Sequence, residues 1–422
     1  MSPTTSRKRI VITNIVTLNP GDAAILWGTF ELLKKAYGSD VEIIVFDKFA
    51  DAAAKHYPWA NFRQSFFGSG RASKFDQALV RYGYGHWGNR LRFLRYSLAI
   101  KMMQKPISLL SLLITTRAER KDLECYLNAD LILSTGGTYL IENYNLSSSI
   151  YDFRLCQKSG RPYGLFTQTL GPFKKKENQL AFKDIFSNAR LIFLRDQQSK
   201  KHIQEIGVSN PNIHLAADAA FSMCRISANK EQSSPIRIAV SVRSLKFFSD
   251  ELETEYFQSI ASAIQDLVKN HQADITFLST CQGIPEYWVD DSAVAVEICK
   301  LLPADIRQQV TVDSHFRQPE AIRDIYAGFD LVIATRMHAA ILALCAGTPT
   351  LGIAYEFKTL ELFNNLNMPE NVISTQGITA NQLIYKLSMM LDDLELQRKK
   401  VISTMPKMQT SAEHVIAPLN AL

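Results

Sequence analysis

The sequence is poor in the features that mark metal, disulfide and membrane proteins. Its six cysteines form no CxxC pair and no Cys/His spacing of the zinc-binding kind, so we expect reduced thiols and no metal. No run of about 18 apolar residues occurs, which argues against a membrane-spanning helix. The N-terminal segment MSPTTSRKR lacks the apolar stretch of a signal peptide. These absences predict a cytoplasmic protein that needs no cofactor.

Acidic residues are nearly absent from residues 81–121, which hold nine Lys and Arg side chains against the single acid Glu119. This local surplus exceeds the net charge of +6 of the whole chain. The pattern fits a solvated helix face beside a buried one. It also fits a basic amphipathic helix that lies against anionic lipid, or a lipid-linked substrate, at the inner face of a membrane. We expect no nucleic-acid partner.

Short apolar strands alternate with helical patterns along most of the chain. The strand-like segments are IVITNI, VEIIVF, DLILST, PYGLFTQ and LIFLR in the first half, and RIAVSV, DITFLST, DLVIA and LGIAY in the second. Such alternation predicts parallel sheets covered by helices on both faces, which is the α/β class. We therefore predict two Rossmann-like doubly wound domains that face a cleft.

The predicted domain bounds follow from changes in composition. The first domain covers residues 1–225 and carries a basic helical insertion at about 60–125. The polar segment ISANKEQSSPI reads as a linker, and the second domain covers residues 226–395. The tail, residues 396–422, is predicted to pack back on the first domain.

Ligands in doubly wound sheets bind beyond the carboxyl ends of the strands, so the residues that follow each strand are the candidates. In the first domain the candidates for an acceptor site are Asn14, Asn19, Gly21, Gly136, Gly137 and Gln168. Asp22 fits the N-cap of the following helix, although capping alone would explain it. Glu142 lies just beyond the glycine pair. Glycine lets a ligand approach the N–H groups of a helix N-terminus.

Cations follow three strands of the second domain. Arg243 follows RIAVSV, Arg336 and His338 follow DLVIA, and Lys358 follows LGIAYEF. Gln282 follows DITFLST. Cations gathered at one sheet edge create a positive field that favours an anionic ligand.

Structural roles are the alternative for these side chains. The arginines could pair with Asp330, Glu356 or another carboxylate, and His338 could bond a backbone carbonyl. Residues two apart share a side only in extended chain. Arg336 and His338 therefore converge on one ligand only if the next helix begins at about Ala339.

The segments NPGDAAI, LILSTGGTYL, LRDQQS and, above all, DLVIATRMHAAILALCAGTPTLGIAYEFK resemble the polysaccharide pyruvyl transferase family, over about residues 9 to 365. The resemblance implies a GT-B-like fold. It also implies transfer of the carbon skeleton of phosphoenolpyruvate (PEP) to sugar hydroxyls as a ketal. Arg243 and the triplet Arg336, Met337 and His338 match residues that bind PEP in that family.

PEP carries a carboxylate and a phosphate, which two arginines and Lys358 match in charge. His338 is the candidate proton donor or phosphate partner, because imidazole exchanges a proton near neutral pH. Asp22 and Glu142 are candidates to activate a sugar hydroxyl of a polysaccharide or its lipid-linked precursor. Two alternatives stay open: a glycosyltransferase of the same fold with a nucleotide-sugar donor, and a non-catalytic carbohydrate-binding protein.

Overall fold

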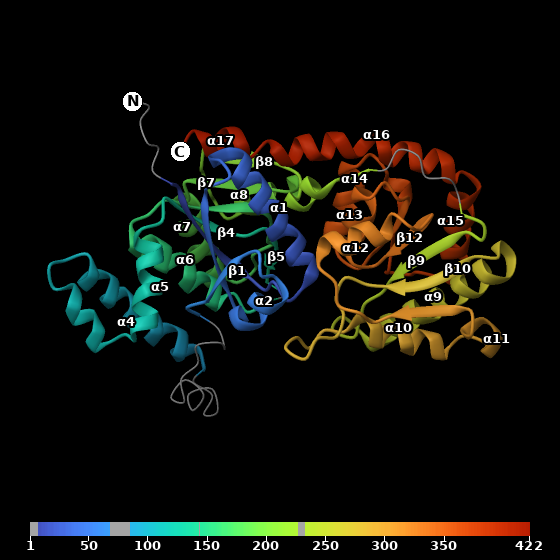
Figure 1. Ribbon diagram of the computed structural model, residues 1–422, viewed down its shortest axis with the longest axis horizontal. Coiled ribbons are helices and arrows are strands. Elements are labelled where there is room, and N and C mark those ends of the chain that lie inside the picture. The colour runs from blue at the N-terminus through green and yellow to red at the C-terminus, as the bar shows by residue number, and fades with distance from the viewer. Residues whose placement is uncertain (1–6, 68–84, 143, 227–232) are drawn as a thin grey trace. The chain divides into compact units, whose positions relative to one another are not determined.

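The computed structural model describes residues 7–67, 85–142, 144–226 and 233–422 (Figure 1). Its chain divides into two compact units. Of the described residues, unit 1 takes those in 7–18, 29–219 and 413–422, and unit 2 takes those in 19–28 and 220–412. Residues 19–28 and the larger part of the tail thus pack in unit 2, which differs from the bounds expected from sequence.

A parallel sheet forms the centre of unit 1. Its strands are β1 (Arg9–Ile15), β2 (Glu42–Asp47), β3 (Asn61–Gln64), β4 (Leu131–Ser134), β5 (Gly137–Leu140), β6 (Tyr163–Leu170), β7 (Leu191–Leu194) and β8 (Ile213–Leu215). The order is β3-β2-β1-β4-β6-β7-β8, and β5 pairs with β6. Every residue of β4, β6 and β7 is buried, which explains why these strands read as continuous apolar runs.

Helices cover the sheet of unit 1 and extend from it. They are α1 (Pro20–Tyr37), α2 (Ala50–His56), α4 (Gly85–Met103), η2 (Ser108–Leu113), α5 (Arg117–Leu127), α6 (Ser147–Ser159), α7 (Lys176–Ser187), α8 (Gln197–Glu205), η3 (Ala219–Met223) and α17 (Ile416–Asn420). Two of these helices divide between the units: the first part of α1, up to residue 28, and η3 from residue 220 onward belong to unit 2. Local capping sets some starts: Thr116 and Glu119 form a reciprocal capping box at α5.

The predicted helical insertion at 60–125 begins later than expected. Asn61–Gln64 form β3, which pairs in parallel with β2 at the edge of the sheet. The strand escaped prediction because an edge strand is half solvated and needs no apolar alternation. Residues 68–84 lie outside the described part, and from Gly85 to Leu127 the segment is helical, as predicted.

Unit 2 contains the second parallel sheet. Its strands are β9 (Arg237–Ser241), β10 (Asp274–Leu278), β11 (Val310–Asp313), β12 (Leu331–Ala334), β13 (Thr350–Ala354) and β14 (Val372–Ser374), in the order β11-β10-β9-β12-β13-β14. The helices are α9 (Asp250–His271), α10 (Asp291–Lys300), α11 (Ala304–Arg307), α12 (Pro319–Tyr326), α13 (Met337–Cys345), α14 (Phe357–Asn365), η4 (Pro369–Asn371), α15 (Ala380–Asp392) and α16 (Leu394–Glu413). The alternation of strands and helices agrees with the sequence pattern.

Both sheets reverse their strand order beside their first strand. In unit 1 the reversal lies between β1 and β4, and in unit 2 it lies between β9 and β12. Such a reversal leaves a crevice at the carboxyl ends of the two strands, because the connecting helices leave them on opposite faces. These two strand pairs are therefore where ligand-binding residues are expected.

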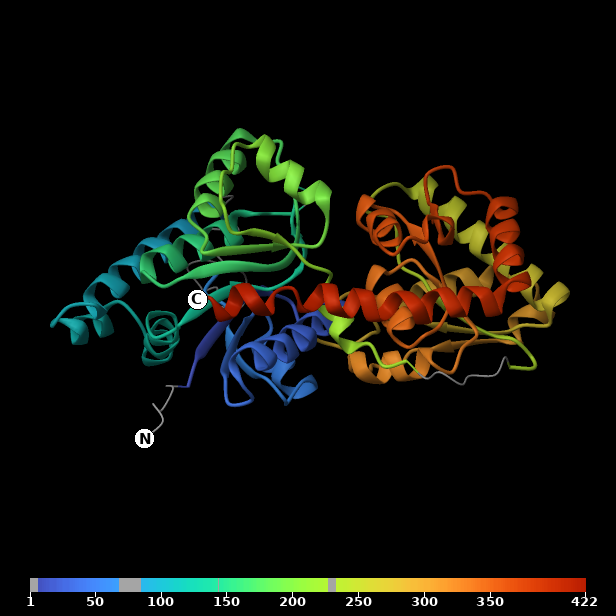
Figure 2. The ribbon, with the colours of Figure 1, turned by 90° about the horizontal axis from the view of Figure 1, so that it is seen from above.

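The C-terminal tail is helical and divides between the units. Figure 2 shows α16 as a continuous red helix. Its residues up to 412 belong to unit 2, whereas residues 413–422 belong to unit 1. In unit 1, Glu413 pairs with Lys35 at 2.5 Å and the Tyr37 hydroxyl donates to the Leu419 carbonyl at 2.9 Å. Within the described residues, no helix is both long enough and apolar enough to span a bilayer.

Candidate functional site

The two arginines of unit 2 follow neighbouring strands at the same offset. In the pairing of β9 with β12, Ser241 lies opposite Ala334. Arg243 and Arg336 each come two residues after these partners. The register therefore brings both guanidinium-bearing residues to the point where the strand order reverses, as their positions after the strands predicted.

Arg336 is held by a buried carboxylate from the start of α10. Its Nε donates to Asp291 Oδ2 at 2.9 Å and its Nη2 to Asp291 Oδ1 at 2.6 Å. Burial raises the pKa of Asp291, against the opposing effect of Arg336. Burial alone would lower the pKa of Arg336, but Asp291 raises it well above its ordinary value. The guanidinium thus stays charged, and its Nη1 bonds no described residue.

The ion pair of Arg336 with Asp291 answers which carboxylate, if any, is the structural partner of this arginine. Asp330 pairs with Arg398 and Glu356 pairs with Lys358, so neither is the partner of Arg336. A carboxylate pairing does exist, with Asp291. The two hydrogen bonds to Asp291 use only Nε and Nη2 of Arg336. They therefore fix the direction of the guanidinium and leave its Nη1 edge for a ligand.

Helix α13 begins earlier than the sequence indicated. Arg336 is its N-cap residue, with extended φ and ψ of −79° and 122°, and the helix starts at Met337 instead of about Ala339. His338 therefore lies in the first helical turn, and the extended segment up to Ala339 that was predicted from sequence is wrong, because only Arg336 keeps extended backbone angles. No side chain caps this N-terminus. Free N–H groups at a helix start favour an anion, and the fixed charge of Arg336 adds to that preference.

His338 lies against the start of α1. A Cβ atom on Gly21 would lie 2.8 Å from His338 Nδ1 and 3.1 Å from Asn19 Oδ1, so a side chain there would force the imidazole of His338 to shift. Asn19 precedes the helix, and its Oδ1 accepts the Gly21 N–H at 2.9 Å. The predicted N-cap role of Asp22 is therefore wrong: Pro20 occupies the first helical position and Asn19 supplies the capping oxygen.

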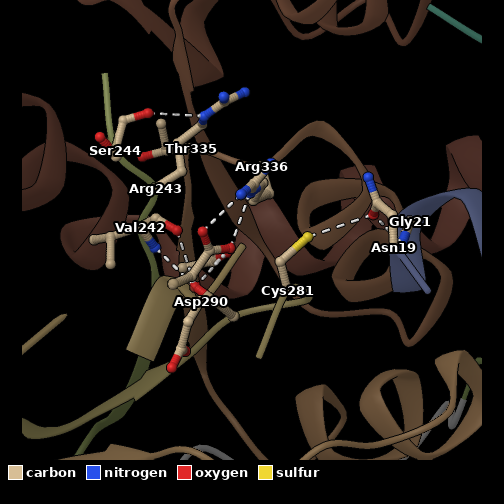
Figure 3. A network of polar contacts seen from close by, with 12 residues as sticks. Asn19, Gly21, Val242, Arg243, Ser244, Cys281, Asp290, Thr335 and Arg336 are labelled. Atoms are coloured by element: carbon tan, nitrogen blue, oxygen red, sulfur yellow. Dashed lines mark hydrogen bonds and ion pairs between the residues drawn. The ribbon is translucent and has the colours of Figure 1, made fainter. Parts of the chain in front are cut away.

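Cys281 lies between Arg336 and the segment Asn19 to Gly21 at the start of α1 (Figure 3). Its thiol donates to Asn19 Oδ1 at 3.4 Å. Burial raises the pKa of Cys281 to about 12, with Arg336 lowering it and Asp22 among the charges that raise it. A thiol that stays protonated is a packing and hydrogen-bonding group, not an activated nucleophile. Asn19, Gly21, Asp22, Arg336 and His338 thus share one neighbourhood around Cys281.

Arg243 is positioned by an aromatic ring. Its guanidinium carbon lies 4.3 Å from the Tyr355 ring centroid, and Nη1 donates to the Tyr355 hydroxyl. Lys358 lies 5.4 Å from the same centroid and pairs with Glu356 at 2.7 Å. Burial opposes ionisation of Tyr355, yet Lys358 and then Arg243 lower its pKa below the ordinary value. The pKa shift follows from the two cations that lie beside the ring.

Two predicted residues of unit 2 are buried away from solvent. Met337 is buried in the first turn of α13. Gln282 is also buried, and its Nε2 donates to the Asp313 carbonyl at 3.0 Å. Both support the shape of the site instead of presenting polar atoms to solvent.

In unit 1 the strand reversal gathers a second polar group. Asn14, with a left-handed φ of 55°, directs its amide to Ser134 at 3.4 Å and Asp152 at 3.5 Å. Tyr126 donates to the other Asp152 oxygen at 3.0 Å. Burial raises the pKa of Asp152 to about 6, although hydrogen bonds from Thr13 and Tyr126 lower it. The predicted residue Asn14 thus lies at the carboxyl ends of β1 and β4.

The other predicted residues of unit 1 have structural contacts. Gly137 begins β5 with a φ of 142°, directly after Gly136. Gln168 is fully buried in β6, and its amide donates to the Thr135 carbonyl and to the Tyr139 hydroxyl. Glu142 accepts from Asn178 Nδ2 at 2.8 Å. The strand β6 runs to Leu170, so Gln168 lies within the sheet and not in the loop expected after it.

Sequence reasoning missed Asp291, Cys281, Tyr355 and Asp152. Asp291 offered a faint signal, because it follows Asp290, whose Oδ1 caps α10 by accepting the Ser292 N–H. One acid sufficed for the cap, and the second was left without a local role. Within the described residues no group of three or more His, Cys, Asp or Glu side chains is arranged to hold a metal ion.

Comparison with known proteins gives this arrangement a context. The family model for polysaccharide pyruvyl transferase matches residues 19–356, which include Arg243, Arg336 and His338. The chain belongs to the polysaccharide pyruvyl transferase family. The resemblance drawn from sequence is therefore confirmed. One relative of this chain is the amylovoran biosynthesis protein AmsJ of Erwinia amylovora, which is 27% identical over 281 residues. The match covers 63% of this chain and 66% of AmsJ, just under two thirds of its length.

Solved structures share the fold at low identity. The HepE protein of Anabaena, solved with UDP and glucose, has a TM-score of 0.58 and 11% identity, with 99% of this chain and 100% of that chain covered. Sucrose-phosphate synthase of Thermosynechococcus elongatus has a TM-score of 0.56 and 12% identity, with 98% and 100% covered. These likenesses show the fold alone. They confirm the predicted α/β fold of GT-B type for this family member.

Proposed function

We propose that this chain transfers a pyruvyl group from PEP to two hydroxyls of a sugar, forming a ketal and releasing phosphate. The observation that carries the proposal is the pair Arg243 and Arg336, set at equal offsets after paired central strands. The carboxylate and the phosphate of PEP both suit guanidinium groups. Membership of the pyruvyl transferase family supports this choice of donor.

The reaction needs one proton at carbon and two sugar hydroxyls. A proton is delivered to the methylene carbon of PEP while the first hydroxyl attacks the neighbouring carbon and loses its own proton. Phosphate then leaves with the electron pair of the C–O bond, and the second hydroxyl closes the ring at the same carbon. One released hydroxyl proton balances the proton used at the methylene carbon, and the other leaves with phosphate.

The residues of unit 2 divide these tasks in our proposal. Arg336, oriented by Asp291, binds one anionic group of PEP through Nη1, and the N-terminus of α13, which no side chain caps, adds to the binding. Arg243 binds the other group, and Lys358 adds positive charge. His338, in the first turn of α13, delivers the proton. A positioned acid of this kind typically contributes about 10²- to 10⁴-fold to the rate.

Asp22 is the base we assign for the acceptor hydroxyl. It lies in the first turn of α1, and its charge reaches Cys281 in the centre of the site. Glu142, the other candidate, already accepts from Asn178 and from the Lys175 N–H at 3.4 Å. The acceptor we propose is a sugar of an exopolysaccharide or of its lipid-linked precursor, consistent with the amylovoran role that the name of AmsJ gives that relative.

Turnover tests the proposal directly. Protein is incubated with PEP and an oligosaccharide acceptor, and phosphate release and the mass gain of the acceptor are followed. Release that needs both substrates, with a mass gain equal to a pyruvate ketal, is expected. The donor test uses thermal shift with PEP, UDP-glucose and GDP-mannose. Stabilisation by a nucleotide sugar alone would favour a glycosyltransferase, and sugar binding without any turnover would favour a carbohydrate-binding protein.

A further inference from the structure

Helix α4 carries apolar side chains on the face that points to solvent. Trp87, Leu91, Leu94 and Leu98 recur at spacings of four, three and four residues, which places them on one side of the helix. All four are exposed, Leu94 by 55%. In a helix at the surface of a soluble protein, this face is normally polar.

The opposite face of α4 is already used for packing. Tyr96, Ala99 and Ile100 are buried in the apolar core of unit 1, and Tyr96 contacts the ring of Phe66 at 5.0 Å between centroids. Arg92 is also buried. The outward leucines are thus a second apolar surface that the described residues of unit 1 leave exposed.

The turn after α4 extends this surface. In η2, Leu109 and Leu113 are 73% and 80% exposed, and Leu110 and Leu112 are also exposed. The turn packs against α4, and Arg120 Nη1 holds it by donating to the Ser108 carbonyl at 3.1 Å. Both views show this teal segment projecting from the body of unit 1 (Figures 1 and 2). We call the exposed apolar residues of α4 and η2 the α4–η2 surface.

Exposed cations lie on α4, on the turn that follows it and on the adjoining helix α5. The exposed ones in the described residues are Arg90, Lys101, Lys105, Arg117 and Lys121. Arg90 lies over the Trp87 ring, 4.9 Å from its centroid. The acids of α5 are all paired: Glu119 with Arg95 at 2.6 Å and the Tyr96 hydroxyl at 2.7 Å, Asp122 with Arg63 at 3.2 Å and Glu124 with Arg120 at 3.1 Å. The surface therefore combines exposed leucine and tryptophan with net positive charge.

We propose that the α4–η2 surface docks on the headgroup region of an anionic lipid bilayer. Leucine and tryptophan would enter the boundary between headgroups and acyl chains, while the flanking Lys and Arg bind anionic headgroups. A second copy of this chain suits the surface less well. A symmetric dimer would bring the same five exposed cations against one another, and like charges repel. Lipid charge complements them instead.

The proposal is independent of the proposed activity, and its test needs no turnover. Full-length protein is co-sedimented with phosphatidylcholine vesicles that contain or lack phosphatidylglycerol, at low and at high salt. We expect binding only with phosphatidylglycerol, and release by salt, because the attraction is screened. Leu94→Gln/Leu98→Gln and Lys101→Glu/Lys105→Glu should each weaken binding by about tenfold or more.

Matched variants separate this surface from general effects. Leu180→Gln removes an exposed leucine of α7, and Lys174→Glu/Lys176→Glu makes the same charge change elsewhere in unit 1. Both should bind as the parent protein does, and all variants should keep its circular dichroism. Absence of sedimentation at low salt would overturn the proposal. So would light scattering that shows a dimer which Leu94→Gln/Leu98→Gln converts to monomer, because the surface would then belong to a second copy.

Discussion

At the scale of single residues, the direction of the Arg336 guanidinium depends on one buried carboxylate. Asp291 is 1% exposed and accepts two hydrogen bonds from Arg336. Asp291→Asn leaves a buried cation without its charge partner, so we expect a loss of roughly 3 kcal/mol in the free energy of unfolding. Urea unfolding measures this. Glu297→Gln, which breaks the exposed pair with Lys300 on the same helix, is the control and should change stability very little.

Replacement of Arg336 and replacement of His338 should change different kinetic constants. Arg336→Ala removes a binding contact and should mainly raise the KM for PEP. His338→Gln should mainly lower kcat, by about 10²- to 10⁴-fold if the ring transfers a proton. Steady-state kinetics with PEP varied at fixed acceptor separates the two. Near-normal turnover of His338→Gln at saturating PEP would rule out the proton-transfer role.

Asp152 predicts a pH dependence of stability. Burial raises its folded-state pKa from 3.8 to about 6. Below the unfolded pKa the carboxyl is neutral in both states. As pH rises through the folded pKa, the unfolded state gains from ionisation first, so stability falls, by roughly 3 kcal/mol in total. Urea unfolding across this range should show the fall. Asp152→Asn should flatten it, whereas the exposed Asp51→Asn should leave it in place.

Strand-end position was enough to place Arg243 and Arg336 at one edge of the sheet from sequence, because a parallel sheet brings the carboxyl ends of its strands together. It could not find Asp291. That carboxylate reaches Arg336 from a helix start 45 residues earlier in the chain, and no local pattern records the pairing. Cys281 was equally hidden, since its role depends on the approach of Asn19 from α1.

At the scale of elements, the alternation of apolar strands and helices predicted most of both sheets, while element starts were less certain. Helix α13 starts at Met337 because Arg336 alone stays extended. Helix α1 starts at Pro20 because proline suits the first helical position, which leaves Asn19 to cap. Strand β3 was missed because its polar sequence carries no apolar period.

The close fit between the first turns of α1 and α13 gives a test at this scale. Gly21→Ala places a Cβ 2.8 Å from His338 Nδ1, so the imidazole must shift. We expect kcat to fall at least about tenfold, since a displaced catalytic group loses orientation. The thermal midpoint should change little, because alanine suits a helix. The double variant Gly21→Ala/His338→Gln should be no slower than His338→Gln alone, and additive losses would contradict the coupling.

At the scale of the whole molecule, sequence predicted two doubly wound sheets of GT-B type, and the structure and its neighbours bear this out. The assignment of residues 19–28 to unit 2 was beyond prediction. These residues lie early in the chain, and only tertiary packing against Cys281 and His338 reveals where they belong.

The central claim is that unit 2 binds PEP through Arg243 and Arg336, and calorimetric titration of PEP tests it most directly. Arg243→Ala and Arg336→Ala should each weaken PEP binding by roughly 2 to 5 kcal/mol. Arg317→Ala, which removes a cation paired with Asp313 after β11, is the control and should bind PEP normally. Unchanged PEP affinity in Arg243→Ala and Arg336→Ala, or tighter binding of UDP-glucose than of PEP by the parent protein, would contradict the account.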